Sequence, residues 1–268
     1  MASPFILALN AAEGILQIVI ARQEEDGAYT RLCAQDWHAP SKGAELLAPV
    51  LQDAVQRLRL APQDIGRIAI VRGPGSFTGL RLVLATASGL SRATGALQAG
   101  LDYLPLLAAS ALQAIPASCA APRRVWTLTH ARRDLVHLQG FQEQSHASLA
   151  PRPVCEVLVC APVDAALYIN RCESPSLVLG SGLTRNREFF TRALQKAGQD
   201  HALLPPAFDH PSFDALLQTA TQAGYGAADV APLYIRPCDA TDHLERIAAK
   251  MGLDPKAAKQ RLCELTTN

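Results

Sequence analysis

The sequence lacks an excess of charge of either sign. Its 25 lysine and arginine residues nearly balance 24 aspartate and glutamate residues, which leaves a formal net charge of +1. A protein whose whole surface binds nucleic acid or a membrane is usually strongly charged. The overall charge therefore supports neither function, although a local basic patch remains compatible with it.

Long hydrophobic runs are also missing. No segment has the roughly 18 apolar residues that a membrane span needs, and the apolar stretch 1–21 lacks a basic start and is interrupted by Asn10, Glu13 and Gly14. We therefore expect neither a membrane span nor a signal peptide. The seven cysteines are scattered, odd in number and without a Cys-x-x-Cys pair. This pattern is typical of reduced thiols and predicts a cytoplasmic protein.

Neither of the two common glycine-rich nucleotide signatures is present. Residues 73–81 read GPGSFTGLR, which has no Gly-Lys-Ser/Thr and the wrong glycine spacing for a dinucleotide fingerprint. The segment follows an apolar run at 67–71 and precedes a helical stretch at 80–90, and this order points backbone N–H groups at the turn. Ser76 or Thr78 can cap the helix. A plain connection without a ligand is the alternative.

The rest of the chain predicts an α/β protein of two related lobes and a helical tail. Apolar residues make up 49% of the sequence, enough for a large core. Strands are expected at 5–9, 15–20, 30–37, 67–71, 124–129, 135–141, 154–160 and 176–179, and helices at 44–58, 78–95, 101–115, 185–197, 212–223, 243–251 and 255–265. The expected lobes are 1–104 and 105–237, with the last helix of the second lobe able to return to the first, and the tail is 238–268.

Segment 73–81, with Ala-Thr-Ala-Ser-Gly-Leu at 85–90, closely resembles the hallmark of the TsaB (YeaZ) family. Weaker matches lie at 45–49, 131–133, 180–182 and 231–236, so the resemblance covers about residues 5–237. It implies a two-lobed, actin-like or sugar-kinase-like fold and a non-catalytic subunit of the bacterial machinery that makes threonylcarbamoyladenosine in tRNA.

The resemblance also implies partners. In this family the subunit pairs with TsaD, its catalytic relative, and works with TsaE, a small ATPase. The complex transfers a threonylcarbamoyl group to an adenosine beside the anticodon, so this chain is expected to associate with tRNA through the complex. Family members alone form homodimers. No cofactor is expected on the isolated chain, and ATP or ADP is expected only within the complex.

Two sets of candidate site residues follow. We expect helices 44–58 and 78–89 to dock a TsaD-like protein or a second copy, although burial in the chain's own core is the alternative for so apolar a helix. The interface candidates are Leu47, Leu51, Phe77, Thr78, Leu80, Arg81, Leu84, Ala85 and Ser88. The candidates for nucleotide-facing turns are Asn10, Gly73, Gly75, Ser76, Gly180 and Gly182.

No catalytic or metal-binding residue is expected. Asn10 stands where actin-like ATPases carry an aspartate, and an amide is a weak ligand for a hard divalent cation. No two histidines have the His-x-x-x-His spacing of TsaD-type chains; His130 and His137 predict a surface pair on a hairpin rather than a metal site. The hairpin arginines Arg132 and Arg133 favour a solvated tip over a tRNA contact. The alternatives are an ATP-dependent kinase or carbamoyl transferase of this fold, and a generic binding module.

Overall fold

The computed structural model describes residues 3–38, 40, 42–114, 123–144, 150–172, 174–195, 201–235, 248 and 254. The chain divides into two units, Met1–Leu233 and Tyr234–Asn268. The first unit holds both sheets that the described residues form. In the second, Ala248 is helical, and the rest of the predicted tail helices lies outside the described residues except for Asp254.

The first sheet is built from an antiparallel hairpin that is extended by parallel strands. Its members are β1 (Phe5–Asn10), β2 (Ile15–Gln23), β3 (Tyr29–His38), β4 (Ile65–Gly73) and β5 (Leu97–Asp102), in the order β3-β2-β1-β4-β5. β1 pairs antiparallel with β2, and β2 with β3. β4 lies parallel to both β1 and β5.

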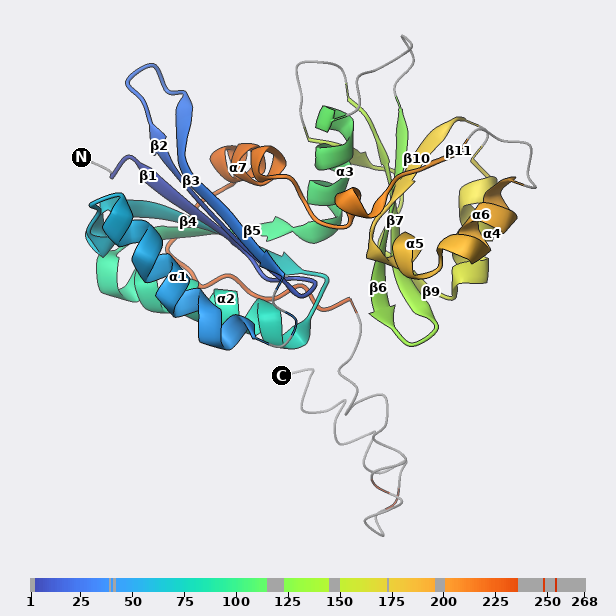
Figure 1. Ribbon diagram of the computed structural model, residues 1–268, viewed down its shortest axis with the longest axis horizontal. Helices are drawn as coiled ribbons and strands as arrows, with labels where there is room; N and C mark the ends of the chain where they lie inside the picture. Colours follow the sequence, from blue (N-terminus) through green and yellow to red (C-terminus); the bar gives the residue numbers. More distant parts are fainter. Residues whose placement is uncertain are drawn as a thin grey trace. The chain divides into compact units, whose positions relative to one another are not determined.

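Helices cover both faces of the first sheet. Alternate side chains of β1 point to opposite faces, and both sets are apolar and buried. Leu7 and Leu9 pack with α1 (Gly43–Arg57) and α2 (Phe77–Thr94) on one face. Ile6 and Ala8 pack with α3 (Tyr103–Ala114) and α7 (Phe213–Gln222) on the other. Figure 1 shows α7, drawn in orange, beside the blue strands β1 to β3, so the end of the unit returns to its beginning.

The second sheet repeats this plan. Its strands are β6 (Arg124–Arg132), β7 (Leu135–Gln142), β8 (Arg152–Pro153), β9 (Leu158–Cys160), β10 (Ser176–Leu179) and β11 (His201–Leu203), in the order β11-β10-β6-β7-β8, with β9 also on β7. β6 and β7 form an antiparallel hairpin, and β10 and β11 extend it in parallel. Helices α4 (Pro162–Asn170), α5 (Ser181–Arg185) and α6 (Arg187–Gln195) cover one face and α3 the other.

The repeated hairpin with parallel extension confirms the predicted two-lobed, actin-like α/β fold. Two short 3₁₀ helices, η1 (Pro62–Asp64) and η2 (Pro206–Phe208), complete the described elements. The lobe boundaries at 104 and 237 stay predictions. Within the described residues, no helix combines the length and the hydrophobicity that crossing a membrane requires.

Several elements differ from the sequence prediction. β5, α4, α5 and β11 were not expected, and α3 begins at Tyr103. The helix expected at 185–197 begins as α6 at Arg187, after the separate short helix α5 ends at Arg185. β5 carries a glycine because an added Cβ at Gly100 would lie 2.8 Å from Val230 Cγ1. The expected surface pair of histidines is wrong for His137, which is buried with Nδ1 3.2 Å from Thr129 Oγ1.

Candidate functional site

The hallmark segment forms the end of β4, the following turn and the first turn of α2. Ser76 is the N-cap of α2: its Oγ accepts a hydrogen bond from the Gly79 N–H at 3.3 Å. Its carbonyl accepts one from the Leu80 N–H at 2.9 Å. The helix ends at Gly95, whose φ of 78° is the left-handed conformation that favours glycine. The start and the end of α2 are therefore both encoded in the sequence.

The glycines of this segment let it pack against the turn between β1 and β2. An added Cβ at Gly75 would lie 2.5 Å from the Ala12 carbonyl oxygen, and one at Gly79 would collide with the Ala11 carbonyl oxygen. The Ser76 N–H also donates to the Ala12 carbonyl. Two stretches of backbone thus approach each other more closely than any side chain would allow.

Gly73 serves a second contact. Its φ is 127°, and an added Cβ would lie 2.7 Å from the Leu233 carbonyl oxygen. The Leu233 N–H donates to the Arg72 carbonyl at 2.8 Å. The hallmark turn therefore lies between the first hairpin and residues near the end of the first unit.

Asn10, a candidate for a nucleotide-facing turn, has no side-chain atom that is exposed to solvent. The side chain is 0% exposed; its Nδ2 donates to Gln17 Oε1 at 2.8 Å, and its Oδ1 accepts from the Ala12 N–H at 3.0 Å. Gln17 Nε2 in turn donates to the Pro211 carbonyl at 2.9 Å. Asn10 holds the hairpin turn and ties it, through Gln17, to the segment before α7.

The later glycine turn repeats the packing of the first. Gly180 is the N-cap of α5 with a φ of 108°, and an added Cβ there would collide with the Leu128 carbonyl oxygen of β6. An added Cβ at Gly182 would lie 3.0 Å from Val136 Cγ1 of β7. Each lobe thus uses a glycine turn to place a helix against its own first hairpin.

The two turns are joined by a hydrogen bond that the sequence did not suggest. Ser181 Oγ donates to Glu13 Oε1 at 2.8 Å and accepts from the His130 N–H at 2.9 Å. Glu13 Oε2 is buried without a hydrogen-bond partner in the described part of the chain. Burial, reinforced by the nearby charge of Asp209, raises the pKa of Glu13 to about 7 although the Ser181 hydroxyl opposes the rise. The only sequence signal was a glutamate within an apolar stretch.

Further polar groups surround this bridge. Thr184 Oγ1 donates to Asp209 Oδ1 at 2.8 Å, and burial raises the pKa of Asp209. The Tyr103 hydroxyl donates to the Asp209 carbonyl at 3.1 Å and lies 3.2 Å from His210 Nδ1. Burial lowers the pKa of His130. Among the described residues, no three or more His, Cys, Asp or Glu side chains come together in a way that could hold a metal ion.

The predicted docking helices present only part of the expected set. Leu47 and Leu80 are 1% exposed and Leu51 is 8% exposed, so these three belong to the chain's own core and offer a partner almost no surface. Leu84 is half-buried and packs against the core residues on both faces of the first sheet. Ser88 Oγ donates to Asp229 Oδ1 at 2.8 Å.

The remaining interface candidates lie on the exposed face of α2. Thr78, Arg81 and Ala85 are exposed, and Phe77 is 47% exposed. The Arg81 guanidinium lies 3.7 Å from the centre of the Phe77 ring. The spacing of three and four residues places Thr78, Arg81 and Ala85 on one side of the helix.

Comparison with known proteins shows that the chain is similar to proteins of tRNA modification. Residues 38–150 match the family model described as TsaD, tRNA N6-adenosine threonylcarbamoyltransferase. The tRNA threonylcarbamoyladenosine biosynthesis protein TsaB of Escherichia coli K12 is 27% identical over 160 residues, which are 56% of this chain and 64% of the E. coli protein. The match thus spans slightly less than two thirds of that relative.

Two solved structures from Pseudomonas aeruginosa share the fold. One, of a protein described as similar to the peptidase YeaZ, has a TM-score of 0.67 at 22% identity and covers 87% of this chain and 99% of that one. The other, YeaZ, has a TM-score of 0.65 at 21% identity and covers 86% and 99%. The E. coli relative and the motif at 73–81 thus agree that the chain is similar to TsaB/YeaZ proteins, and the two structures show that it shares their fold.

Proposed function

We propose that this chain is a non-catalytic subunit that supports a TsaD-like catalytic partner in the threonylcarbamoylation of tRNA adenosine. The name of the E. coli relative and the description of the matching family model both refer to threonylcarbamoyladenosine in tRNA, and they support the proposal. A TsaE-like ATPase and tRNA belong to the proposed complex, and ATP or ADP binds only within it.

The observation that carries the non-catalytic role is the content of the first hairpin turn. Asn10 stands where a metal-binding carboxylate is needed, and both of its polar atoms bond within the chain. The Ser76 N–H, at the start of α2, bonds to the Ala12 carbonyl rather than facing a phosphate. Phosphoryl chemistry depends on a metal and on anion-binding groups at such a turn. Asn10 and the Ser76 N–H are poorly suited to bind either the metal or a phosphate, and this supports a non-catalytic role.

The exposed face of α2 supports the docking role. Thr78 and Ala85 are small, and Ala48 on the neighbouring α1 is exposed as well. Small side chains let a second helix approach closely, and Arg81 beside Phe77 adds the residue types that are enriched at interfaces. A stable contact of this kind buries about 2,000 Å² or more. The proposed occupant is a TsaD-like protein or, for the isolated chain, a second copy.

Ala85→Arg tests this surface. Alanine and arginine both favour helices, and residue 85 is exposed, so the variant should fold while its long charged side chain blocks close helix contact. Leu84→Glu is less informative, because Leu84 packs in its own lobe. Ala207→Arg, at an exposed alanine of η2, is the matched control. We expect Ala85→Arg alone to lose co-purification with the TsaD-like protein of the same cell.

Two results would contradict the proposal. If Ala85→Arg kept both its co-purification and its oligomer size, the exposed face of α2 would not be the docking surface. Calorimetry of the isolated chain with ATP and Mg²⁺ addresses the alternative, a kinase or carbamoyl transferase of the same fold. Tight binding with turnover would favour that enzyme over a supporting subunit.

A further inference from the structure

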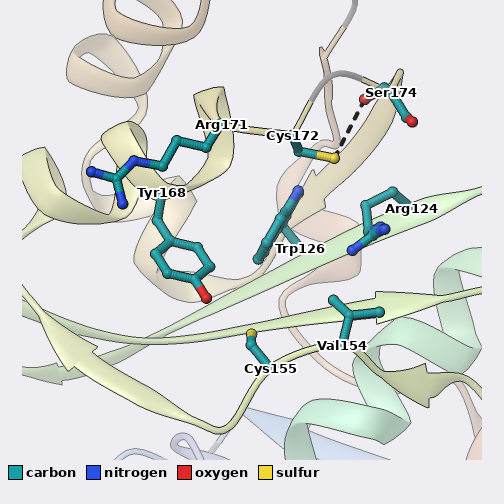
Figure 2. A pocket seen from close by; sticks show the side chains of 8 residues that line it. All are labelled: Arg124, Trp126, Val154, Cys155, Tyr168, Arg171, Cys172 and Ser174. Carbon is teal, nitrogen blue, oxygen red and sulfur yellow. Dashed lines mark hydrogen bonds between the residues drawn. The ribbon is translucent and has the colours of Figure 1, made fainter.

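The second lobe contains a hollow that the proposed function does not use. Arg124 and Trp126 are two residues apart on β6 and therefore point to the same face of the sheet. Tyr168, Arg171 and Cys172 follow at helical spacing at the end of α4. With Val154, Cys155 and Ser174 they line a cavity of about 510 Å³ (Figure 2).

Two buried donors of this lining have no acceptor in the part of the chain that is described. Trp126 is 3% exposed, and neither its Nε1 nor Nε of Arg124 has a hydrogen-bond partner there. The indole is held firmly, since an added Cβ at Gly140 on the neighbouring strand would lie 2.8 Å from its Cη2. Buried N–H groups are nearly always paired, so these two call for an acceptor that comes from outside.

The positive charge of the lining residues indicates that the acceptor is an anion. Arg124 and Arg171 are its two charged residues within the described chain, and neither has an ion pair with a described carboxylate. Figure 2 shows them on opposite sides of the aromatic pair Trp126 and Tyr168. Guanidinium groups bind phosphate through several parallel hydrogen bonds, and Arg124 lies next to Trp126, so one phosphate can accept from both unpartnered donors.

The remaining lining favours a ring. The Trp126 and Tyr168 rings meet edge to face with centroids 5.7 Å apart, and Val154 adds an exposed apolar side chain. The cavity volume lies within the range of roughly 300–1,000 Å³ that is typical of small-molecule sites. A free phosphate ion would fill only a small part of it.

We infer that this cavity of the second lobe binds a phosphate monoester that is attached to a ring-bearing group, as in a nucleoside monophosphate. The Arg124 guanidinium and the neighbouring Trp126 N–H hold the phosphate, the ring lies against Tyr168 and Val154, and Arg171 on the other side of the aromatic pair adds positive charge to the lining. This site is separate from the α1–α2 surface and needs no partner subunit.

Titration with AMP tests the inference. The chain has two tryptophans, so Trp37→Phe leaves Trp126 as the only indole; its N–H resonance and its fluorescence both report on the cavity. We expect saturable binding and a downfield shift of that resonance as it gains an acceptor. Arg171→Gln, at an exposed position, and Arg124→Met should each weaken AMP binding about tenfold or more.

Arg192→Gln on α6 is the matched control, because it removes the same charge from an exposed site outside the cavity; its AMP affinity should not change. Adenosine and inorganic phosphate should each bind more weakly than AMP. The inference is overturned by an absence of saturable binding, by equal AMP affinities of Arg171→Gln and Arg192→Gln, or by adenosine or phosphate binding as tightly as AMP. Ala85→Arg should bind AMP normally, which separates this site from the docking proposal.

Discussion

Replacing Glu13 by glutamine should change how the stability of the protein depends on pH. Glu13 joins the hairpin turn of the first lobe to Ser181 of the second, and one of its carboxylate oxygens is buried without a partner in the described chain. The amide oxygen of glutamine can still accept the Ser181 hydrogen bond. The substitution therefore removes the ionisation and leaves the shape of the side chain nearly unchanged.

The magnitude follows from the pKa. Burial raises the pKa of Glu13 from 4.5 to about 7, and each pKa unit corresponds to about 1.4 kcal/mol. A carboxyl whose pKa is raised by folding stabilises the native state fully below the unfolded value, here 4.5, and loses that contribution as the pH rises through the folded value. The wild type should thus lose up to about 3 kcal/mol between about pH 4.5 and about pH 8 through this residue.

Urea unfolding between about pH 5 and about pH 9 measures the effect. We expect the free energy of unfolding of Glu13→Gln to rise relative to that of the wild type as the pH rises, by up to about 3 kcal/mol at the alkaline end. Other groups of the cluster, such as Asp209 and His130, titrate in both proteins, so the difference reports on Glu13 together with its coupling to Asp209. Glu25→Gln, at an exposed site between β2 and β3, is the control. Parallel pH curves for wild type and Glu13→Gln would refute the reasoning.

Further substitutions probe the packing. Gly79→Ala should cost about 2 kcal/mol or more in unfolding free energy, because the new methyl group collides with the Ala11 carbonyl. Gly89→Ala on the same helix has no atom within 4 Å and should stabilise the protein by about 0.5–1 kcal/mol; equal thermal shifts of these two variants would contradict the glycine roles. Arg123→Met should cost about 2 kcal/mol, since it leaves the carboxylate of Glu143, 2.8 Å away and largely buried, without its ion pair; an unchanged urea midpoint would show the pair to be neutral.

Local patterns were sufficient for much of the first lobe. The apolar runs of β1, β2 and β4 and the helical spacing of α1 predicted their elements, because each is long and fully or half buried. The left-handed glycine at residue 95 marked the end of α2. The order of expected strands and helices predicted two lobes. Their actin-like arrangement came from the resemblance carried by the motif at 73–81, since hydrophobic periodicity alone does not specify how strands are ordered.

Elements that depend on distant contacts were missed. β5 is a six-residue strand with a glycine, and its strand conformation depends on pairing with β4 and on the close approach of Val230. At the candidate site, the sequence could not show which side of α2 faces its own sheet, so Leu80 was grouped with exposed residues such as Ala85. The bridge from Glu13 to Ser181 joins positions 168 residues apart, a pairing that local sequence does not encode.

Helix α3 makes the two lobes depend on each other for folding. Eight of its residues, from Tyr103 to Ala111, are buried, and it contacts strands of both sheets. A helix that is apolar all round cannot remain in water on its own. Loss of either sheet would strip one side of this helix, so the halves should melt together in a single cooperative transition, and neither half should be stable when expressed without the other.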